Sequence, residues 1–572
     1  MVSSFVQDGG SYHFVNGSIL TKARHGRDGQ ATFAESLFVQ DGVIKAIGSN
    51  DEVLKAYQHV EATTIDLKQK TVIPSFIDGH MHLLLTGQLI HQVSLAGCQS
   101  LEELRDTLSR YAKANPDVPR ILARGWMQIL TPNGVDTSML DDIDPRPLYV
   151  NAIDLHSMWC SSSALAELGV TADTPEPAGG EIHRDNQGNP SGLLSEGAIV
   201  SITWSYLASV ATDEDSKNYM ISALEAYSAS GYTGMIEMAM DERAWDILAR
   251  LYEERPDLPM RIAAYWLIRP AEDEAARVSQ VERAIELSRR FNIRSTPKLR
   301  IVGIKVVIDG VTESCTAYLS EPYANSQLPQ PIWSGEELEP VVKKAVAGGL
   351  QIAFHAIGDA AVSLAIRSLE LSSKPGGRHR IEHLEITSPG DAKKLARLGI
   401  TASFQPIHAD PYLLQHWPRL LDTKRAARCY AWREFADAGA LIALGTDSPV
   451  THWNPLNNLH VATTRRSVQD ALMHPVNEHF RLGLCEAVVG ATAGSAKSVF
   501  ADHLTGSLEL GKSADLVILD MEWDDESLLK AEIQETWFEG RRIWCKDSDT
   551  VHGRWDCRIV EIGGRLGLSG AS

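Results

Sequence analysis

The stretch SGEELEPVVKKAVAGGLQIAFHA, residues Ser334 to Ala356, contains one complete helix and the strand that follows it. Ser334 and Glu337 have the spacing of a capping box at a helix start, and Gly348-Gly349 ends the helix before an apolar strand. The segments DAKKLARLGITASFQP (391–406) and WREFADAGALIALGTDSP (432–449) repeat this order. Helices that alternate with apolar strands predict parallel βα units.

Apolar strands of this kind occur eight times along the chain. Eight parallel strands, each followed by a helix, are typical of a closed barrel, so we predict an α/β chain with a TIM-like (β/α)8 barrel. The predicted barrel strands are residues 72–78 (VIPSFID), 232–238, 260–267, 301–309, 350–356, 380–386, 400–406 and 441–447.

The two ends of the chain have a different pattern. They show short alternating strands with tight-turn signals, such as Asp41-Gly42 and Glu539-Gly540. We predict a composite β-sandwich domain from residues 1–70 and 505–572, and a barrel over residues 71–504. Residues 98–215 follow the first barrel strand and are too long for a simple connection, so we predict an insertion near the barrel mouth.

Composition limits the possible partners. Hydrophobic residues are 44% and charged residues 22% of the 572 residues, as in ordinary globular proteins. A net charge of -20 predicts no nucleic-acid partner and no anionic membrane partner. The seven cysteines are scattered without a C-x-x-C motif, which indicates reduced thiols. Without a signal-peptide pattern, we expect a cytoplasmic protein; a homodimer is left open.

Five side chains with metal-binding chemistry stand at the ends of predicted barrel strands: His80, His82, His355, His383 and Asp447. His80 and His82 are two residues apart, so both point to the same face of their strand. Taken singly, His355, His383 and Asp447 are each more often ordinary core or rim residues, and the His80/His82 pair fits chance spacing or hydrogen-bonded rim histidines as well as a metal site. Together, at one end of a barrel, they predict a divalent-metal site, because a catalytic metal needs three or more protein ligands and an open position.

Lys305 lies inside the fourth predicted strand, where an unpaired ammonium group is costly to bury. An ion pair with Asp309 or Glu313, or a side chain that reaches the barrel end, would explain it. Alternatively, carbon dioxide has carboxylated Lys305 and converted the cation into an anionic bridge between two metals. The residues alone leave both explanations open.

As a set, these motifs resemble the metal-dependent amidohydrolase superfamily. The resemblance extends from about Gly42 to Trp544 and is greatest for amidohydrolase family 3, the branch that includes N-substituted formamide deformylases. The long insertion, DLHSMW with His156 and GLLSEGA with Glu196 also fit that branch. The other motifs that carry the resemblance are FIDGHMH (76–82), IKVVIDG (304–310), HAIGDAA (355–361), RIEHLEI (380–386), GTDSP (445–449) and GSLELGKSADLVILD (506–520).

The resemblance implies a site for one or two divalent ions. Zinc is the expected metal, although imidazole and carboxylate ligands accept several. His80 and His82 would bind one metal with Asp447, and His355 and His383 would bind the second. A carboxylated Lys305 would bridge the two ions. Metal-activated hydroxide would attack the substrate, with Asp447 as general base and then general acid.

Further residues are expected to contact the substrate: Trp126, His156, Glu196, Asp309 and Glu313. The resemblance gives His156 a catalytic role as a substrate or oxyanion contact, and the alternative is an ordinary loop histidine. For Trp126 the alternative is packing. For Glu196, Asp309 and Glu313 it is a solvated or ion-paired role.

The leading prediction is a metal-dependent hydrolase of a C–N bond in a small-molecule amide, formamide or N-acyl amine, and not in a peptide. A heterocycle deaminase of the same superfamily is the nearest alternative, and Lys305 on the fourth strand favours amide hydrolysis over it. A second alternative is a catalytically inactive barrel that acts as a binding protein. Such proteins typically lack the metal ligands that this chain keeps.

Overall fold

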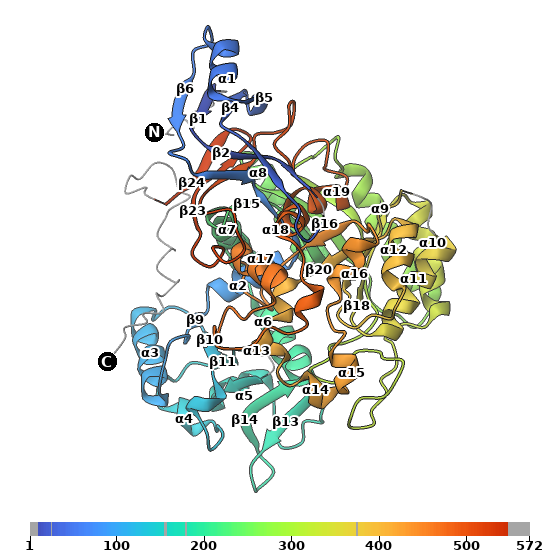
Figure 1. Cartoon of the computed structure of the whole chain (residues 1–572). Helices are drawn as coiled ribbons and strands as arrows, with labels where there is room; N and C mark the ends of the chain where they lie inside the picture. The colour runs from blue at the N-terminus through green and yellow to red at the C-terminus, as the bar shows by residue number, and fades with distance from the viewer. Residues whose placement is uncertain (1–9, 25, 154–156, 178–179, 373–375, 547–572) are drawn as a thin grey trace. The chain divides into compact units, whose positions relative to one another are not determined.

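Parallel strands form an eight-stranded sheet in the larger of two units, in the order β21-β20-β19-β18-β17-β16-β15-β8. This confirms the predicted TIM-like barrel, although its first strand begins at Phe76 and not at Val72 (Figure 1). The strands are β8 (Phe76–Met81), β15 (Tyr232–Met240), β16 (Arg261–Leu267), β17 (Leu299–Val307), β18 (Gln351–Ala356), β19 (Arg380–His383), β20 (Thr401–Phe404) and β21 (Ile442–Leu444).

The computed structural model describes residues 10–24, 26–153, 157–177, 180–372 and 376–546. Among these described residues, the larger unit contains those up to Leu83 and those from Leu224 onward, and the second unit contains those within Leu84–Ala223. None of the helices within the described ranges is long and apolar enough to cross a membrane.

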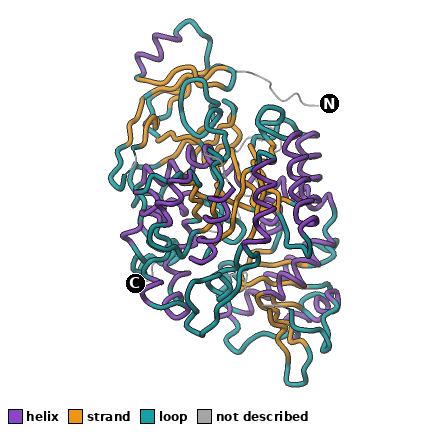
Figure 2. Tube along the Cα trace, turned by 90° about the vertical axis from the view of Figure 1, so that its right-hand side faces the viewer, coloured by secondary structure: helices purple, strands orange, loops and turns teal. Residues whose placement is uncertain are grey.

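Helices follow the barrel strands along the chain, and in Figure 2 helices drawn in purple run alongside the orange strands. In α10 the predicted capping box is present: the Glu337 N–H donates to Ser334 Oγ and the Ser334 N–H donates to Glu337 Oε2. The main helices after the strands are α8 (Glu242–Glu254), α9 (Glu274–Arg290), α10 (Gly335–Ala347), α11 (Asp359–Ser372), α12 (Asp391–Leu398), α16 (Trp432–Asp437), α17 (Pro455–Thr464), α18 (Leu484–Val489) and α19 (Ser495–Ser498).

The first and last barrel strands meet just beyond the end of β21. The Asp447 N–H donates to the His80 carbonyl at 2.7 Å, and the His82 N–H donates to the Ser448 carbonyl at 2.8 Å. Gly445 permits this approach, because a Cβ at that position would lie 2.3 Å from the His80 backbone nitrogen. The two hydrogen bonds that close the barrel therefore involve His80, His82 and Asp447, which the sequence predicted as metal ligands. Their fourth member is Ser448, which follows Asp447 in the chain.

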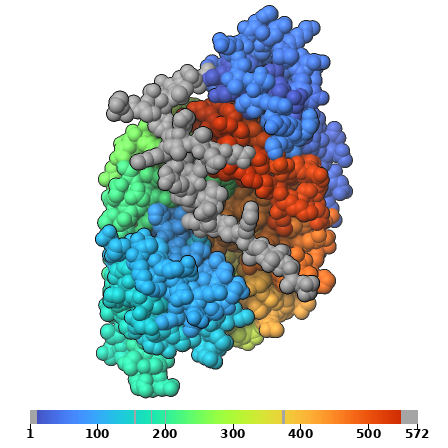
Figure 3. Space-filling model, turned by 90° about the vertical axis from the view of Figure 1, so that its left-hand side faces the viewer, coloured from blue at the N-terminus to red at the C-terminus, as the bar shows by residue number. Residues whose placement is uncertain are grey.

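Two further sheets are built from the two ends of the described chain. One has the order β5-β4-β1-β6, and the other has the order β24-β23-β22-β7-β2-β3. Figure 3 shows the early segments in blue beside the late segments in red. The strands are β1 (Tyr12–Val15), β2 (Ser18–Ala23), β3 (Ala31–Ala34), β4 (Ser36–Gln40), β5 (Val43–Gly48), β6 (Thr63–Asp66), β7 (Thr71–Pro74), β22 (Leu516–Asp520), β23 (Glu532–Phe538) and β24 (Arg541–Cys545).

These terminal sheets share one core, in which Phe14, Leu37 and Val72 pack with Leu516 and Trp537. The strand β7 pairs with β2 and β22, so residues 71–74 belong to this sheet although the sequence analysis placed them with the barrel. The predicted hairpin turns are present, with positive φ at Asp41-Gly42 and Glu539-Gly540.

The second unit has its own six-stranded sheet and its own core. The sheet order is β13-β14-β12-β11-β10-β9. Its elements are β9 (Val93–Ser94), α3 (Leu101–Ala114), β10 (Ile121–Trp126), α4 (Ser138–Asp141), β11 (Leu148–Ala152), β12 (Ser157–Cys160), α5 (Ser162–Leu168), β13 (Gly180–Arg184), β14 (Pro190–Glu196) and α6 (Ser205–Val210). The helices α2 (Leu83–Ile90) and α7 (Asp213–Ala229) span its two boundaries with the larger unit.

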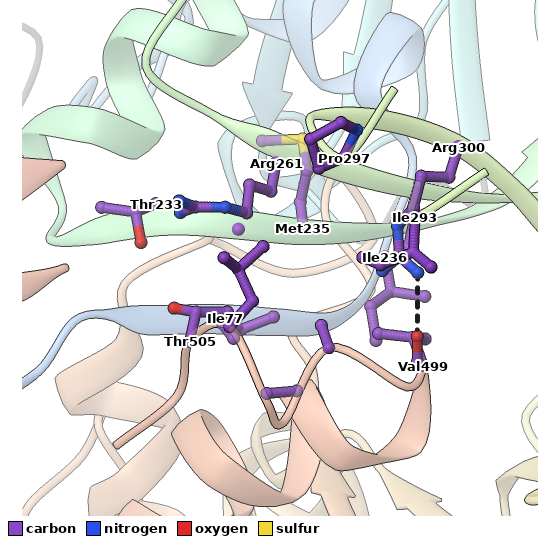
Figure 4. A pocket seen from close by; sticks show the side chains of 15 residues that line it. Ile77, Thr233, Met235, Ile236, Arg261, Ile293, Pro297, Arg300, Val499 and Thr505 are labelled. Atoms are coloured by element: carbon purple, nitrogen blue, oxygen red, sulfur yellow. Dashed lines mark hydrogen bonds between the residues drawn. The ribbon is translucent and has the colours of Figure 1, made fainter. Parts of the chain in front are cut away.

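A pocket in the larger unit lies at the starts of the barrel strands (Figure 4). Ile77, Thr233 and Arg261 line it from the first residues of β8, β15 and β16. Arg300, another lining residue, donates to the Val499 carbonyl at 3.0 Å. Because the predicted ligands stand at the opposite ends of these strands, this pocket is not part of the site described below.

Candidate metal centre

The strand ends bring the predicted histidines together. The ring centroids of His80 and His82 are 5.6 Å apart, and those of His80 and His383 are 5.1 Å apart. The His355 and His383 rings are closer still, at 4.3 Å. Burial lowers the pKa of His80 to about 4 and that of His355 to about 3. Both imidazoles are therefore neutral near pH 7, the form in which imidazole binds a metal.

Asp447 faces two of these imidazoles with the same carboxylate oxygen. Its Oδ1 lies 3.1 Å from His82 Nε2 and 3.4 Å from His80 Nε2. Burial acts to raise the pKa of Asp447, but His80 and His82 outweigh it and hold that pKa well below the usual range. The carboxylate is therefore ionised at neutral pH.

These separations fit a shared divalent cation. Two ligand atoms that each lie about 2.1 Å from a tetrahedral zinc ion are about 3.4 Å apart. The His82–Asp447 and His80–Asp447 contacts, at 3.1 and 3.4 Å, match that value. His80, His383 and Asp447 also form a group whose ligand atoms all lie within 4.8 Å of one another. The donor set of imidazole nitrogens and a carboxylate suits zinc and several other divalent metals.

Glu382, at the end of β19, fixes the orientation of His80. Its Oε2 lies 2.8 Å from His80 Nδ1, and its Oε1 accepts from Arg380 Nε at 2.7 Å. Both Glu382 and Arg380 are fully buried. A carboxylate that holds Nδ1–H leaves Nε2 as the metal-binding nitrogen, a common arrangement around zinc.

Asp78 joins the first strand to the loop that carries Asp447. It accepts from the Thr446 N–H at 2.9 Å, from Thr446 Oγ1 at 2.6 Å and from the Tyr227 hydroxyl at 3.0 Å. Burial raises the pKa of Asp78 to about 6. These bonds hold the backbone on both sides of the His80–Asp447 contact.

Glu237, from β15, was not identified from the sequence. Its Oε2 accepts from the Leu83 N–H at 2.5 Å, and its Oε1 lies 3.9 Å from His82 Nδ1. Burial raises its pKa above the usual value. The carboxylate therefore lies beside His82 and fixes the chain that leaves β8.

Lys305 is 3% exposed, so its side chain does not reach solvent. Burial lowers the pKa of Lys305 to about 8, while the charges of Glu382 and Asp447 act in the opposite direction. Asp309 and Glu313, the two suggested ion-pair partners of Lys305, form hydrogen bonds with other groups. Asp309 accepts three backbone N–H groups, from Tyr318, Ile357 and Gly358, and Glu313 accepts from Trp417 Nε1 at 3.0 Å.

His355 lies on the Asp309 side of the site. Its Nε2 is 3.7 Å from Asp309 Oδ1 and 3.4 Å from the Gly310 carbonyl oxygen. Burial raises the pKa of Asp309 to about 7. Asp309 therefore lies next to a predicted ligand, whereas Glu313 is exposed. Their predicted contacts with substrate stay predictions.

Besides Glu237 and Glu382, the sequence did not identify His408 and Glu385 as functional candidates. His408 lies in the 3-10 helix η3 (Pro406–Ala409), directly after β20, and its Nε2 is 3.7 Å from Asp447 Oδ2. Glu385 Oε1 is 3.5 Å from His408 Nδ1. The signal that could have found His408 is its place after ITASFQP, the seventh predicted barrel strand.

The remaining predicted residues belong to the second unit. Trp126 is buried, donates from Nε1 to Thr131 Oγ1 at 3.2 Å and packs against Trp159. Glu196 is the last residue of β14, and His156 lies outside the described residues. The proposed roles of Trp126, Glu196 and His156 in substrate binding stay predictions.

Comparisons with known proteins identify a family and relatives of this chain. The model of the amidohydrolase family (Amidohydro_3) matches residues 63–544. The Arabidopsis thaliana protein LONG AFTER FAR-RED 3 is 28% identical over 551 residues, which cover 93% of this chain and 91% of that protein. The N-substituted formamide deformylase of Arthrobacter pascens is 25% identical over 516 residues, with 86% and 91% covered.

Among solved structures, an uncharacterized metal-dependent hydrolase from Pyrococcus horikoshii superposes with a TM-score of 0.73 at 25% identity. The match covers 90% of this chain and 98% of that one. A second uncharacterized metal-dependent hydrolase, from Pyrococcus furiosus, gives a TM-score of 0.72, also at 25% identity, with 90% and 99% covered.

Proposed function

The chain belongs to the amidohydrolase family, and from this premise we propose that it is a metal-dependent hydrolase of a carbon–nitrogen bond other than a peptide bond. The observation that carries the proposal is the convergence of His80, His383 and Asp447, whose ligand atoms all lie within 4.8 Å of one another, with His82 Nε2 3.1 Å from Asp447 Oδ1. The relative named N-substituted formamide deformylase supports the choice of formamides, small amides and N-acyl amines as substrates.

His80 Nε2, His82 Nε2 and Asp447 Oδ1 would hold the cation, with His383 beside them. A divalent cation held by these residues would activate a water molecule and would polarise a substrate carbonyl. Zinc is our proposed metal, because imidazole nitrogen and carboxylate oxygen are its usual ligands. Glu382 keeps Nε2 of His80 available by accepting from Nδ1.

Asp447 is the proposed acid and base. Its ionised carboxylate accepts the proton of the attacking water and passes it to the departing amine nitrogen. The second oxygen, Oδ2, faces His408 at 3.7 Å.

Lys305 is proposed to carry a carboxyl group in the resting protein. Carbon dioxide reacts with the neutral amine, and a pKa of about 8 leaves roughly a tenth of the side chains neutral at pH 7. Intact mass measurement under native conditions would detect the added carbon dioxide, and Lys305→Met provides the control that cannot carry it. Parent protein without the added mass would contradict carboxylation.

The Asp447→Asn variant tests the proposed function. We expect it to lower kcat by about 10²- to 10⁴-fold, because it removes the proton-transfer group. The assay is a hydrolysis screen over formamides, N-acyl amines and cyclic amides, run together with metal analysis. Asp391→Asn is a matched control, since Asp391 is a buried aspartate at the start of α12 that bonds the Ser388 N–H.

Two results would contradict the proposal. Asp447→Asn with the activity of the parent would remove Asp447 from the mechanism. Release of ammonia from heterocycles, without release of a carboxylate from amides, would favour a deaminase instead.

A further inference from the structure

We propose that the pocket at the starts of the barrel strands binds one small monoanion of the size of chloride, held by the Arg300 guanidinium group with Arg261 beside it (Figure 4). Both arginines line this pocket, which has about 380 Å³ of empty space when the open mouth is included. The predicted metal ligands stand at the opposite ends of the strands. Anion binding at this position therefore does not depend on the proposed hydrolysis.

Arg300 is a buried cation without a carboxylate partner among the described residues. It is 5% exposed, and within the described ranges its only hydrogen bond runs from Nη1 to the Val499 carbonyl at 3.0 Å. Burial lowers the pKa of Arg300 to about 10, and the charge of Arg261 acts in the same direction. The guanidinium group is still protonated at neutral pH. Because an unpaired buried charge is costly, a bound anion would stabilise this arrangement.

Arg261 brings a second guanidinium group to the pocket, but its charge is already balanced. Its Nη1 donates to Asp515 Oδ2 at 2.5 Å, and its Nη2 donates to Glu539 Oε1 at 2.8 Å. Lys298 Nζ lies 3.6 Å from the other oxygen of Glu539. The two carboxylates therefore match the charges of Arg261 and Lys298, and the charge of Arg300 is left over.

The pocket also has buried N–H donors to offer to an anion. Neither Arg300 Nε nor Arg261 Nε has a hydrogen-bond partner within the described ranges, and both atoms are buried. Buried polar groups in native proteins are nearly always hydrogen-bonded, so two such donors in the wall of one pocket need an explanation. Hydrogen bonds from a guanidinium group to an anion are among the stronger ones in proteins.

The rest of the lining favours a small monoanion over phosphate or sulfate. Ile77, Ile236 and Ile293 contribute apolar side chains to the wall (Figure 4). The Thr233 hydroxyl is engaged with Ser75 Oγ, 2.5 Å away. A dianion with four oxygens would need more donors and a second uncompensated cation, and burying it without them is costly. A single charge matches the one excess cation.

The simpler explanation is a water molecule that accepts from Arg300 Nε. Buried water commonly satisfies polar groups in this way. Water would leave the charge of Arg300 unbalanced, however, and it predicts that one anion affects the protein no differently from another at equal ionic strength.

Two measurements on the full-length protein separate these explanations. Thermal unfolding compares sodium chloride with sodium gluconate, a bulky polyhydroxylated anion, at equal ionic strength. The chloride NMR line width in a sodium chloride solution reports binding directly, because bound chloride broadens the line. We expect line broadening and a midpoint about 1–2 °C higher in chloride, since a ligand of the folded state stabilises it.

The Arg300→Met variant should lose both responses, because it removes the charge and the Nε donor. Arg124→Met is the matched control and should respond as the parent does. Arg124 is a half-buried arginine of β10 whose Nε donates to the Leu89 carbonyl at 3.0 Å, and it does not line the pocket. Circular dichroism checks folding, and Arg300→Gln replaces Arg300→Met if the latter does not fold.

A parent protein that shows neither line broadening nor a higher midpoint in chloride overturns the proposal, even if no variant folds. A folded Arg300 variant that broadens the chloride line as much as the parent does also overturns it. The proposed function is tested separately, because amide hydrolysis by a protein without a chloride response would leave that function intact and remove only the anion site.

Discussion

Glu382 and Glu385 flank His383 in the sequence, yet each lies beside a different imidazole. Glu382 contacts His80 Nδ1 at 2.8 Å, and Glu385 contacts His408 Nδ1 at 3.5 Å. His383 itself has a φ of 76°, in the left-handed region that non-glycine residues rarely adopt. This backbone turn at the end of β19 places three functional groups from four successive residues around one site.

The Glu382→Gln variant should weaken metal binding. The neutral glutamine amide is a weaker acceptor for the His80 Nδ1–H than the charged Glu382 carboxylate. Loss of such a carboxylate partner typically lowers metal affinity or activity by about 10- to 100-fold. Zinc affinity can be measured by competition with a chromophoric chelator. Glu486→Gln is the matched control, because Glu486 is a buried glutamate that pairs with Arg433. Equal zinc affinities for the two variants would contradict the role of Glu382.

The apolar run from Val72 to Met81 forms two strands and not one. Residues 71–74 join the terminal sheet as β7, and residues 76–81 form the first barrel strand, β8. Ser75 lies at the division, where its N–H donates to the Asp515 carbonyl. The sequence does not reveal this division, because both halves are apolar and only their distant partners differ.

Gly445→Ala should disrupt the junction between β21 and β8. The new Cβ would lie 2.3 Å from the His80 nitrogen, so the first strand or the Asp447 loop must shift. We expect a loss of about 1–3 kcal/mol in the free energy of unfolding and weaker zinc binding. Urea unfolding and metal titration measure both. Gly335→Ala, whose Cβ would meet only Leu364 Cδ1 at 3.6 Å, is the control.

If Gly445→Ala bound zinc as tightly as the control, the junction would not determine the geometry of the site. In that case the Asp78 bonds to Thr446 alone would be sufficient to hold the loop.

The sequence predicted the barrel because its signals are local: the caps, the helix-ending glycines and the apolar strands are each readable within about twenty residues. It also predicted which strands end in histidine or aspartate. His408 was missed because it lies in a 3-10 helix beyond the end of its strand. Glu237, Glu382 and Glu385 were missed because their roles depend on side-chain direction, which strand periodicity does not fix where the backbone turns.

The barrel and the terminal sheets are joined through buried charges. Arg261, the first residue of β16, donates to Asp515 Oδ2 at 2.5 Å and to Glu539 Oε1 at 2.8 Å. Asp515 directly precedes β22 of the terminal sheet. If either part unfolded alone, the buried charge in the other part would be left without its partner, which is strongly destabilising. The two parts of the larger unit should therefore unfold together.

The pH dependence of global stability should include a contribution from His379. Burial lowers the pKa of His379 to about 4, and its Nδ1 accepts the Ile352 N–H, which requires the neutral ring. Below pH 6.5 the unfolded chain takes up a proton that the folded chain does not. Stability is therefore lost as pH falls from about 6.5 to about 4, by on the order of 3 kcal/mol.

The His379→Asn variant isolates this contribution, because the Asn carbonyl can still accept the Ile352 N–H. Urea unfolding between pH 4 and 7 should show a shallower loss of stability in the variant than in the parent. Parallel curves for the two proteins would show that His379 does not contribute.

The junction between β8 and the Asp447 loop joins the start of the barrel to its end, and the terminal sheet likewise combines β2, β3 and β7 with β22, β23 and β24. While a ribosome is still making the chain, His80 and His82 emerge long before Asp447 does. Until its last strands leave the exit tunnel, the nascent protein therefore has strand edges without a partner strand. It also has His80 and His82 without Asp447, the third predicted metal ligand. The predicted metal site can therefore form only after Asp447 has left the exit tunnel.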